Sequence, residues 1–154
     1  MKITYKGDYA LKALFLLAMA YNGSEGGLMS IHDIAVKGDM PTTFLEQILL
    51  ALRKGGFVKS RRGMNGGFCL ARPPIEITIG SVIRFIEGPI EPIACIGDDR
   101  YAGCKDVECC IFRDVWKEVS HAVSVVIDTL TFEELLARYQ NRRARAIPVH
   151  EYSI

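Results

Sequence analysis

The chain has 154 residues, which is enough for one domain with a hydrophobic core or for a small domain with an oligomerisation arm. Hydrophobic residues make up 49% and charged residues 24%, a balance that excludes intrinsic disorder, while the net charge of +1 gives no indication of a nucleic-acid partner. The apolar stretch 11–21 is interrupted by Lys12 and is shorter than the ~18 residues of a membrane helix, so we expect a cytoplasmic protein with no membrane partner.

The first two predicted helices lie in the N-terminal third of the chain. The stretch 8–22 is almost continuously apolar, so it predicts a helix that is buried on most sides. Ser30, followed by Asp33, resembles a capping box and predicts the start of a short second helix. Gly38 and Asp39 are expected to end this helix.

A third helix follows at once. It is predicted to start at Pro41, a favoured first helical residue, or at a competing capping box of Thr43 and Glu46, and to end near Lys54. Apolar residues at i, i+3, i+4 and i+7 define its buried face: Leu45, Ile48, Leu49 and Leu52. Two helices joined by a short turn containing glycine are typical of a helix-turn-helix motif.

The polar side of the third helix carries residue types that read DNA bases. Glutamine can pair with adenine, and threonine can bond to a base or touch a thymine methyl group. If this is the recognition helix, its candidate DNA contacts are Thr42, Thr43, Phe44, Gln47 and Arg53. The alternative is that these residues only solvate an amphipathic helix.

The next segment favours the DNA-binding reading. Strands are predicted at 57–61 and 67–70 around a glycine-rich tip, which forms the hairpin of a winged helix. Arg61 and Arg62 are candidates for phosphate or minor-groove contact, and Asn65 lies at the tip. Ten successive residues without an acid contain five basic side chains: Arg53, Lys54, Lys59, Arg61 and Arg62. The alternative to DNA contact is that these charges are only solvated.

Four of the five cysteines lie within 95–110, where glycines and aspartates predict a loop. Several thiolates on one loop can bind zinc or an iron–sulfur cluster. In a reducing compartment, clustered cysteines favour metal binding or redox sensing over structural disulfides. Cys69 lies apart from this loop in a predicted wing strand, where we expect it to pack as a small apolar side chain.

A long helix is predicted directly after the loop, over 111–130. Its apolar residues form a near-heptad stripe: Phe112, Val115, Trp116, Val119, Val123, Val126 and Leu130. This stripe predicts a dimer interface, and the alternative is that it packs inside its own chain. Thr131 and Glu134 predict the start of a short last helix. The residues after Gln140 are expected to form a mobile tail.

These elements predict a mainly α fold with a small β-wing. The expected organisation is a winged helix-turn-helix DNA-binding domain over 1–88, a cysteine-rich loop over 89–110, a dimerisation helix and short helix over 111–139, and a tail over 140–154. No set of side chains in the sequence has the pattern of an enzyme active site, so we do not expect an enzyme.

Several motifs, taken together, match one known family. They are the opening KITYKGDYAL, the FLEQ of the third helix, RGxxGGF at the wing, ARPPxxITIG after it, and CxFRDVWKEV at the start of the long helix. Over about 1–130 the chain closely resembles the Rrf2 family of bacterial winged-helix regulators. The resemblance implies a homodimer that binds a double-stranded DNA operator.

The resemblance also implies a cofactor. Cluster-binding members carry three cysteines on this loop, and Cys95, Cys104 and Cys110 match them, so a [2Fe-2S] or [4Fe-4S] cluster is expected. Cys109 is additional, and it could replace a ligand, act as a resolving thiol, or have no role. Zinc binding or simple thiol chemistry is the alternative for these thiolates.

Members differ in the fourth ligand. IscR-like members use a histidine at the position that Arg113 occupies here, so that ligand is missing. NsrR-like members use an aspartate at the start of the first helix of the other subunit, and Asp8 matches it. The alternative is that Asp8 only interacts favourably with the helix dipole.

The expected function is therefore an iron–sulfur-dependent transcriptional regulator that senses iron, nitric oxide or redox state. The alternative is a cluster-free repressor similar to CymR-like members, controlled by a protein partner or by thiol chemistry.

Overall fold

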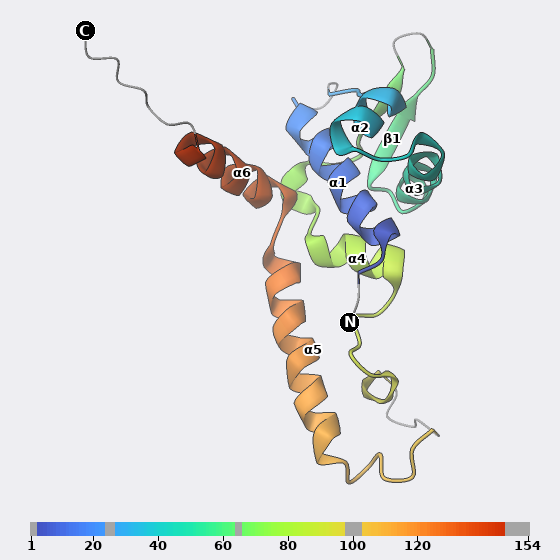
Figure 1. The fold of residues 1–154 in the computed structure, drawn as a ribbon, viewed down its shortest axis with the longest axis vertical. Coiled ribbons are helices and arrows are strands. Elements are labelled where there is room, and N and C mark those ends of the chain that lie inside the picture. The colour runs from blue at the N-terminus through green and yellow to red at the C-terminus, as the bar shows by residue number, and fades with distance from the viewer. Residues whose placement is uncertain (1–2, 24–26, 64–65, 98–102, 147–154) are drawn as a thin grey trace, which may run out of the picture.

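The computed structural model describes residues 3–23, 27–63, 66–97 and 103–146. The fold is mainly α with a small β-wing, as expected, and Figure 1 shows a long helix projecting from a compact group of elements. The described elements are α1 (Tyr5–Ala20), α2 (Ile31–Gly38), α3 (Thr42–Lys54), β1 (Val58–Arg61), β2 (Gly67–Leu70), the 3-10 turn η1 (Pro74–Glu76), α4 (Ile79–Glu87), η2 (Ala94–Ile96), α5 (Ile111–Thr129) and α6 (Phe132–Ala146). We call the part from α1 to α4, residues 3–88, the head.

Helix α1 lies at the centre of the head, in contact with α2, α3, α4, β2 and α6. One face of the helix is fully buried by these neighbours and most flanking residues are half-buried, while Lys12 and Met19 are exposed, so the predicted burial on most sides is confirmed only in part. The fully buried side chains recur at i, i+3, i+4, i+7 and i+8 and so form one face of the helix: Ala10, Ala13, Leu14, Leu17 and Ala18.

The helix-turn-helix is formed by α2 and α3. Ser30 caps α2 as predicted, since its hydroxyl accepts a hydrogen bond of 3.1 Å from the Asp33 amide. Asp39 ends the helix in the left-handed conformation, at φ 50°. The predicted buried face of α3 is confirmed, and Leu45, Ile48, Leu49 and Leu52 are each fully buried.

The start of α3 differs from both predictions. Pro41 is the N-cap, with an extended backbone, so it lies just outside the helix instead of at its first position. Its carbonyl accepts the amide of Leu45 at 3.0 Å and begins the helical ladder at Thr42. The capping box predicted for Thr43 and Glu46 is wrong, because Thr43 is already inside the first turn.

The wing is the antiparallel pair β1–β2, with Val58 opposite Leu70 and Arg61 opposite Gly67. Val58 and Leu70 are buried and fix the base of the hairpin to the core. The loop before α2 adds to this sheet, because Met29 exchanges backbone hydrogen bonds of 2.9 and 2.8 Å with Phe68. This link between distant segments has no local sequence signal.

The last two helices differ sharply in their packing. None of the 19 residues of α5 is buried within the chain. In contrast, Phe132 at the start of α6 is 1% exposed and belongs to the core of the head. The predicted cap of α6 is confirmed, since the Glu134 amide donates to the Thr131 hydroxyl at 3.2 Å.

Helix α6 continues beyond the predicted end near Gln140 and reaches Ala146. Arginine and alanine are good helix formers, and Arg138 pairs with Glu134 at 2.6 Å along one face. Tyr139 also packs edge-on against Phe15 of α1, with ring centroids 5.4 Å apart. Residues 147–154 of the expected tail lie outside the described part of the chain.

The buried position of Phe132 leads to a stability prediction. Phe132→Ala removes a fully buried ring, so the free energy of unfolding should fall by about 3–5 kcal/mol. Urea unfolding followed by circular dichroism measures this change. The matched control is Glu133→Ala, which alters an exposed neighbour and should change stability little. A loss below about 1 kcal/mol for Phe132→Ala would mean that α6 is not part of the core.

Candidate functional site

The N-terminal half of α3 presents polar side chains to solvent. Thr42, Thr43 and Gln47 are exposed, while the opposite face of the helix is buried in the core. Thr43 and Gln47 are four residues apart and so lie on the same face. Their exposure and position are those of base-contacting residues on a recognition helix.

Phe44, another predicted DNA contact, is only half-buried and has a partner within the chain. Its ring packs edge-on against Tyr9 of α1, with centroids 5.7 Å apart. This contact holds the start of α3 on α1 and leaves only part of the ring accessible. Nothing in the local sequence indicates Tyr9 as its partner.

The basic residues link the recognition helix to the wing. The Arg53 guanidinium at the end of α3 donates to the Ser60 hydroxyl on β1 at 3.1 Å, which fixes the helix end against the hairpin. Arg61 and Arg62 are exposed, and the described residues give neither a carboxylate partner. Asn65 lies outside the described residues.

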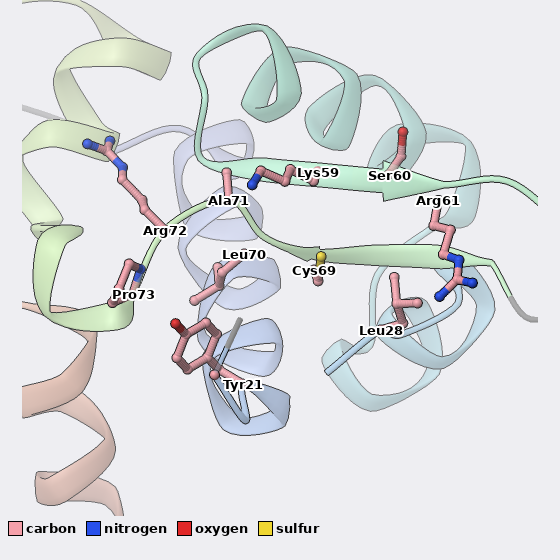
Figure 2. Close-up of a pocket in the computed structure, with 11 residues that line it drawn as sticks. Tyr21, Leu28, Lys59, Ser60, Arg61, Cys69, Leu70, Ala71, Arg72 and Pro73 are labelled. Atoms are coloured by element: carbon pink, nitrogen blue, oxygen red, sulfur yellow. The ribbon is translucent and has the colours of Figure 1, made fainter. Parts of the chain in front are cut away.

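One face of the wing borders a hollow of about 520 Å³ (Figure 2). Lys59 and Arg61 lie on the same strand face as Cys69, which is directly opposite Lys59. No described carboxylate lines the hollow, so the wing carries an unneutralised positive face. Cys69, expected to pack as a small apolar side chain, is half-buried at this hollow and is not part of the core.

The predicted cysteine ligands lie at the far end of α5 from the head (Figure 1). Cys95 in η2 and Cys110 at the N-cap of α5 are half-buried, whereas Cys104 and Cys109 are exposed. All are free thiols. Thiolates of this kind suit an iron–sulfur cluster or zinc in their donor chemistry.

Arg113 holds part of this loop in place. Its Nε donates to the carbonyl oxygen of Cys95 at 2.8 Å, and its amide donates to the carbonyl of Cys110 at 3.1 Å. Arg113 therefore joins the loop to the first turn of α5. The described residues nevertheless include no group of three His, Cys, Asp or Glu side chains close enough to hold a metal ion.

Asp8 lies in the first turn of α1 and pairs with Lys12 at 2.8 Å. Its hydrogen bond raises the pKa of Lys12 above the ordinary value. Asp8 also borders a mainly apolar hollow of about 700 Å³ lined by Ile3, Thr4, Tyr5 and Leu11. Within one chain, the described structure does not place Asp8 in a metal-binding group with the cysteines.

Residues 3–138 match the family model described as "Rrf2: Iron-dependent Transcriptional regulator". An rrf2-like HTH-type transcriptional regulator of Rhodobacter capsulatus is 41% identical over 138 residues, which cover 88% of this chain and 92% of the relative.

Two solved structures are also similar. CymR, the global cysteine regulator of B. subtilis, has a TM-score of 0.72 and 32% identity, with 90% of this chain and 98% of that chain covered. IscR of T. potens has a TM-score of 0.73 and 29% identity, with 99% of this chain and 97% of that chain covered. None of the described helices is both long and apolar enough to cross a membrane. With its helix-turn-helix, its wing and a family match over nearly its whole length, this chain belongs to the Rrf2 family of transcriptional regulators.

Proposed function

We propose that this protein is an iron–sulfur-dependent transcriptional regulator that binds its operator as a homodimer and senses iron, nitric oxide or redox state. The observation that carries the proposal is the set Cys95, Cys104 and Cys110 just before a long helix of which no residue is buried in the described structure.

The DNA-binding part follows from α3 and the wing. Exposed residues at the start of α3 enter the major groove, and the basic residues of β1 contact phosphates or the minor groove. A dimer presents two recognition helices, so the operator is a pseudo-palindrome with half-sites about 34 Å apart, or a multiple of that spacing. Phosphate contacts position the protein, and base contacts determine the sequence.

The dimer follows from the apolar surface of α5. A large contiguous apolar surface on a water-soluble helix is a mark of an interaction site. The large apolar residues of α5 that remain exposed are Ile111, Phe112, Val115, Trp116, Val119, Val125 and Val126. Pairing two α5 helices along the predicted stripe removes much of this surface from water, which favours association.

The sensing part rests on the cysteines and on Asp8. Cys95, Cys104 and Cys110 would hold the cluster, with Asp8 of the partner subunit as the fourth ligand. A bound cluster supplies a centre that reacts with oxidants and nitric oxide and depends on iron supply. Arg113 holds the Cys95 backbone on α5, so ordering of the loop is transmitted directly to the dimer helix.

A cluster-free repressor is the second candidate. It is favoured by the similarity to CymR and by the described residues, which do not gather three metal-binding side chains. Cys104 and Cys109 are exposed, and exposed thiols are accessible to oxidants. In this case the cysteines or a protein partner would control DNA binding without iron.

Anaerobic purification separates the two candidates. Protein purified without oxygen should absorb in the sulfur-to-iron charge-transfer region and contain iron and sulfide. Alanine at Cys95, Cys104 or Cys110 should abolish this absorbance and alter DNA affinity, because each variant loses a thiolate ligand. Cys69→Ala is the matched control and should retain it. Colourless anaerobic protein, with zinc or without metal, would contradict the cluster and leave DNA binding intact.

Base reading can be tested at Gln47. Gln47→Ala should cost about 1–3 kcal/mol on the cognate operator and relax base preference, because it removes a bond to a base edge. Gln140→Ala on α6 is the control with the same chemical change, and Arg62→Ala should weaken all duplexes more evenly. Competition binding with operator and random DNA measures these effects. A wild-type protein with no preferred sequence would overturn the DNA assignment.

The dimer interface can be tested on α5. Glutamate at both Val119 and Val123 places unpaired charges in the apolar stripe, so the variant should sediment as a monomer. His121→Ala, off the stripe on the same helix, should remain dimeric. Sedimentation velocity at micromolar concentration gives the result. A soluble wild-type monomer under these conditions would contradict the prediction.

A further inference from the structure

Helix α4 contacts both α1 and α5. It begins beside the α5–α6 junction, where the Ile79 amide donates to the Leu130 carbonyl at 3.0 Å. The Phe132 amide donates to the Ile77 carbonyl at 3.0 Å, just before α4 begins. The C-terminal end of α5 is therefore fixed to the head by backbone hydrogen bonds on both sides of α4's start.

A polar contact between α4 and α5 lies one turn further along. The Arg84 guanidinium donates through one nitrogen to Asp128 Oδ1 and through the other to Asp128 Oδ2 at 2.9 Å and to Ser124 Oγ at 3.1 Å. We call this group the α4–α5 clamp (Arg84, Ser124 and Asp128). The Asp128 side chain reaches the backbone of α4 here, since a Cβ atom at Gly80 would collide with its carboxylate.

The clamp is better suited to fixing an orientation than to adding stability. The side chains of Arg84 and Asp128 are 38% and 44% exposed, and half-exposed ion pairs contribute little to folding. A planar guanidinium with two parallel hydrogen bonds to one carboxylate does, however, fix the relative orientation of the two helices as well as the distance between them. Further along α5, Ser120 Oγ donates a hydrogen bond of 2.9 Å to the Ile90 carbonyl.

The other end of α4 is fixed to α1. Glu87 Oε1 accepts hydrogen bonds from the Thr4 amide at 3.2 Å, the Thr4 hydroxyl at 2.6 Å and the Gly7 amide at 3.0 Å. A Cβ atom at Gly7 would collide with the Glu87 carboxylate, so glycine permits this approach. Since α1 in turn packs on α2 and α3, the direction of α5 is transmitted through α4 to the recognition helix.

The length of α5 amplifies small changes at the clamp. Its 19 residues span about 28 Å at the rise of an α-helix, so a tilt of about 10° displaces one end by about 5 Å relative to the other. Successive base pairs are only about 3.4 Å apart along the duplex. A modest change of the angle between the head and the dimer helix therefore displaces the head by at least one base-pair step.

From these contacts we propose that the α4–α5 clamp determines the half-site spacing of the operator, by fixing the angle between each head and the α5 pair. The inference rests on the proposed α5 dimer and its binding to two half-sites. Arg84 and Asp128 are positioning residues: they set the distance between the recognition helices without touching DNA. In their absence the apolar junction keeps the head attached, but the head adopts a wider range of angles.

The test uses the full chain and a set of operators whose central spacer is shortened or lengthened by one or two base pairs. Wild-type protein should bind the best spacer at least about tenfold more tightly than its neighbours, a difference of about 1.4 kcal/mol. Arg84→Gln and Asp128→Asn should reduce this ratio several-fold and still sediment as dimers. Arg138→Gln, which breaks a comparable exposed ion pair on α6, is the matched control and should retain the wild-type ratio.

The exchanged pair Arg84→Asp with Asp128→Arg adds a second measurement, because it re-forms the ion pair and should recover part of the spacing preference. A general loss of stability lowers affinity for every spacer and leaves the ratio unchanged, so the ratio reports orientation. If the Arg84 and Asp128 variants are dimeric and keep the wild-type spacing ratio, the clamp does not determine the half-site spacing, and the proposed function is unaffected. A wild-type protein that is monomeric, or binds no operator, would contradict the proposed function itself.

Discussion

The burial of α1 is the constraint on which the rest of the structure depends. A helix that is apolar on most sides must bury much of its surface against neighbouring elements. Helices α2, α3, α4 and α6 and the wing strand β2 each cover part of it. This arrangement places α3, the second helix of the helix-turn-helix, on one side of α1 and α4, which connects to α5, on another. The helix-turn-helix and the long helix α5 therefore share one support.

The sequence predicted the elements whose signals are local. Ser30 and Thr131 could be identified as caps because a hydroxyl and the amide three residues later belong to one turn. The buried face of α3 follows from its periodicity, and the wing from its glycines and alternating residues. The start of α3 was harder, because proline is compatible with both the N-cap and the first helical position.

The features that sequence reasoning missed are contacts between distant segments. Neither Tyr9 against Phe44 nor Arg84 against Asp128 has a spacing that a local pattern could reveal. The geometry of the cysteine site also has no local sequence signal. The residue types predict soft-metal chemistry, but a loop has no fixed period, so spacing alone cannot determine which thiols meet. Arg113 illustrates this, since its sequence position indicated only a missing ligand, whereas its side chain organises the loop.

The place of Phe132 in the core also affects the order in which the protein folds. The head draws most of its core from the first half of the chain, yet one of its fully buried side chains comes from the start of α6. Chains emerge from the ribosome N-terminus first, and contacts between distant residues form late. The head thus completes its core only after the cysteine loop and α5 have been synthesised. A nascent chain that stops earlier leaves apolar surface exposed, so quality-control proteases can remove a DNA-binding head that lacks its regulatory arm.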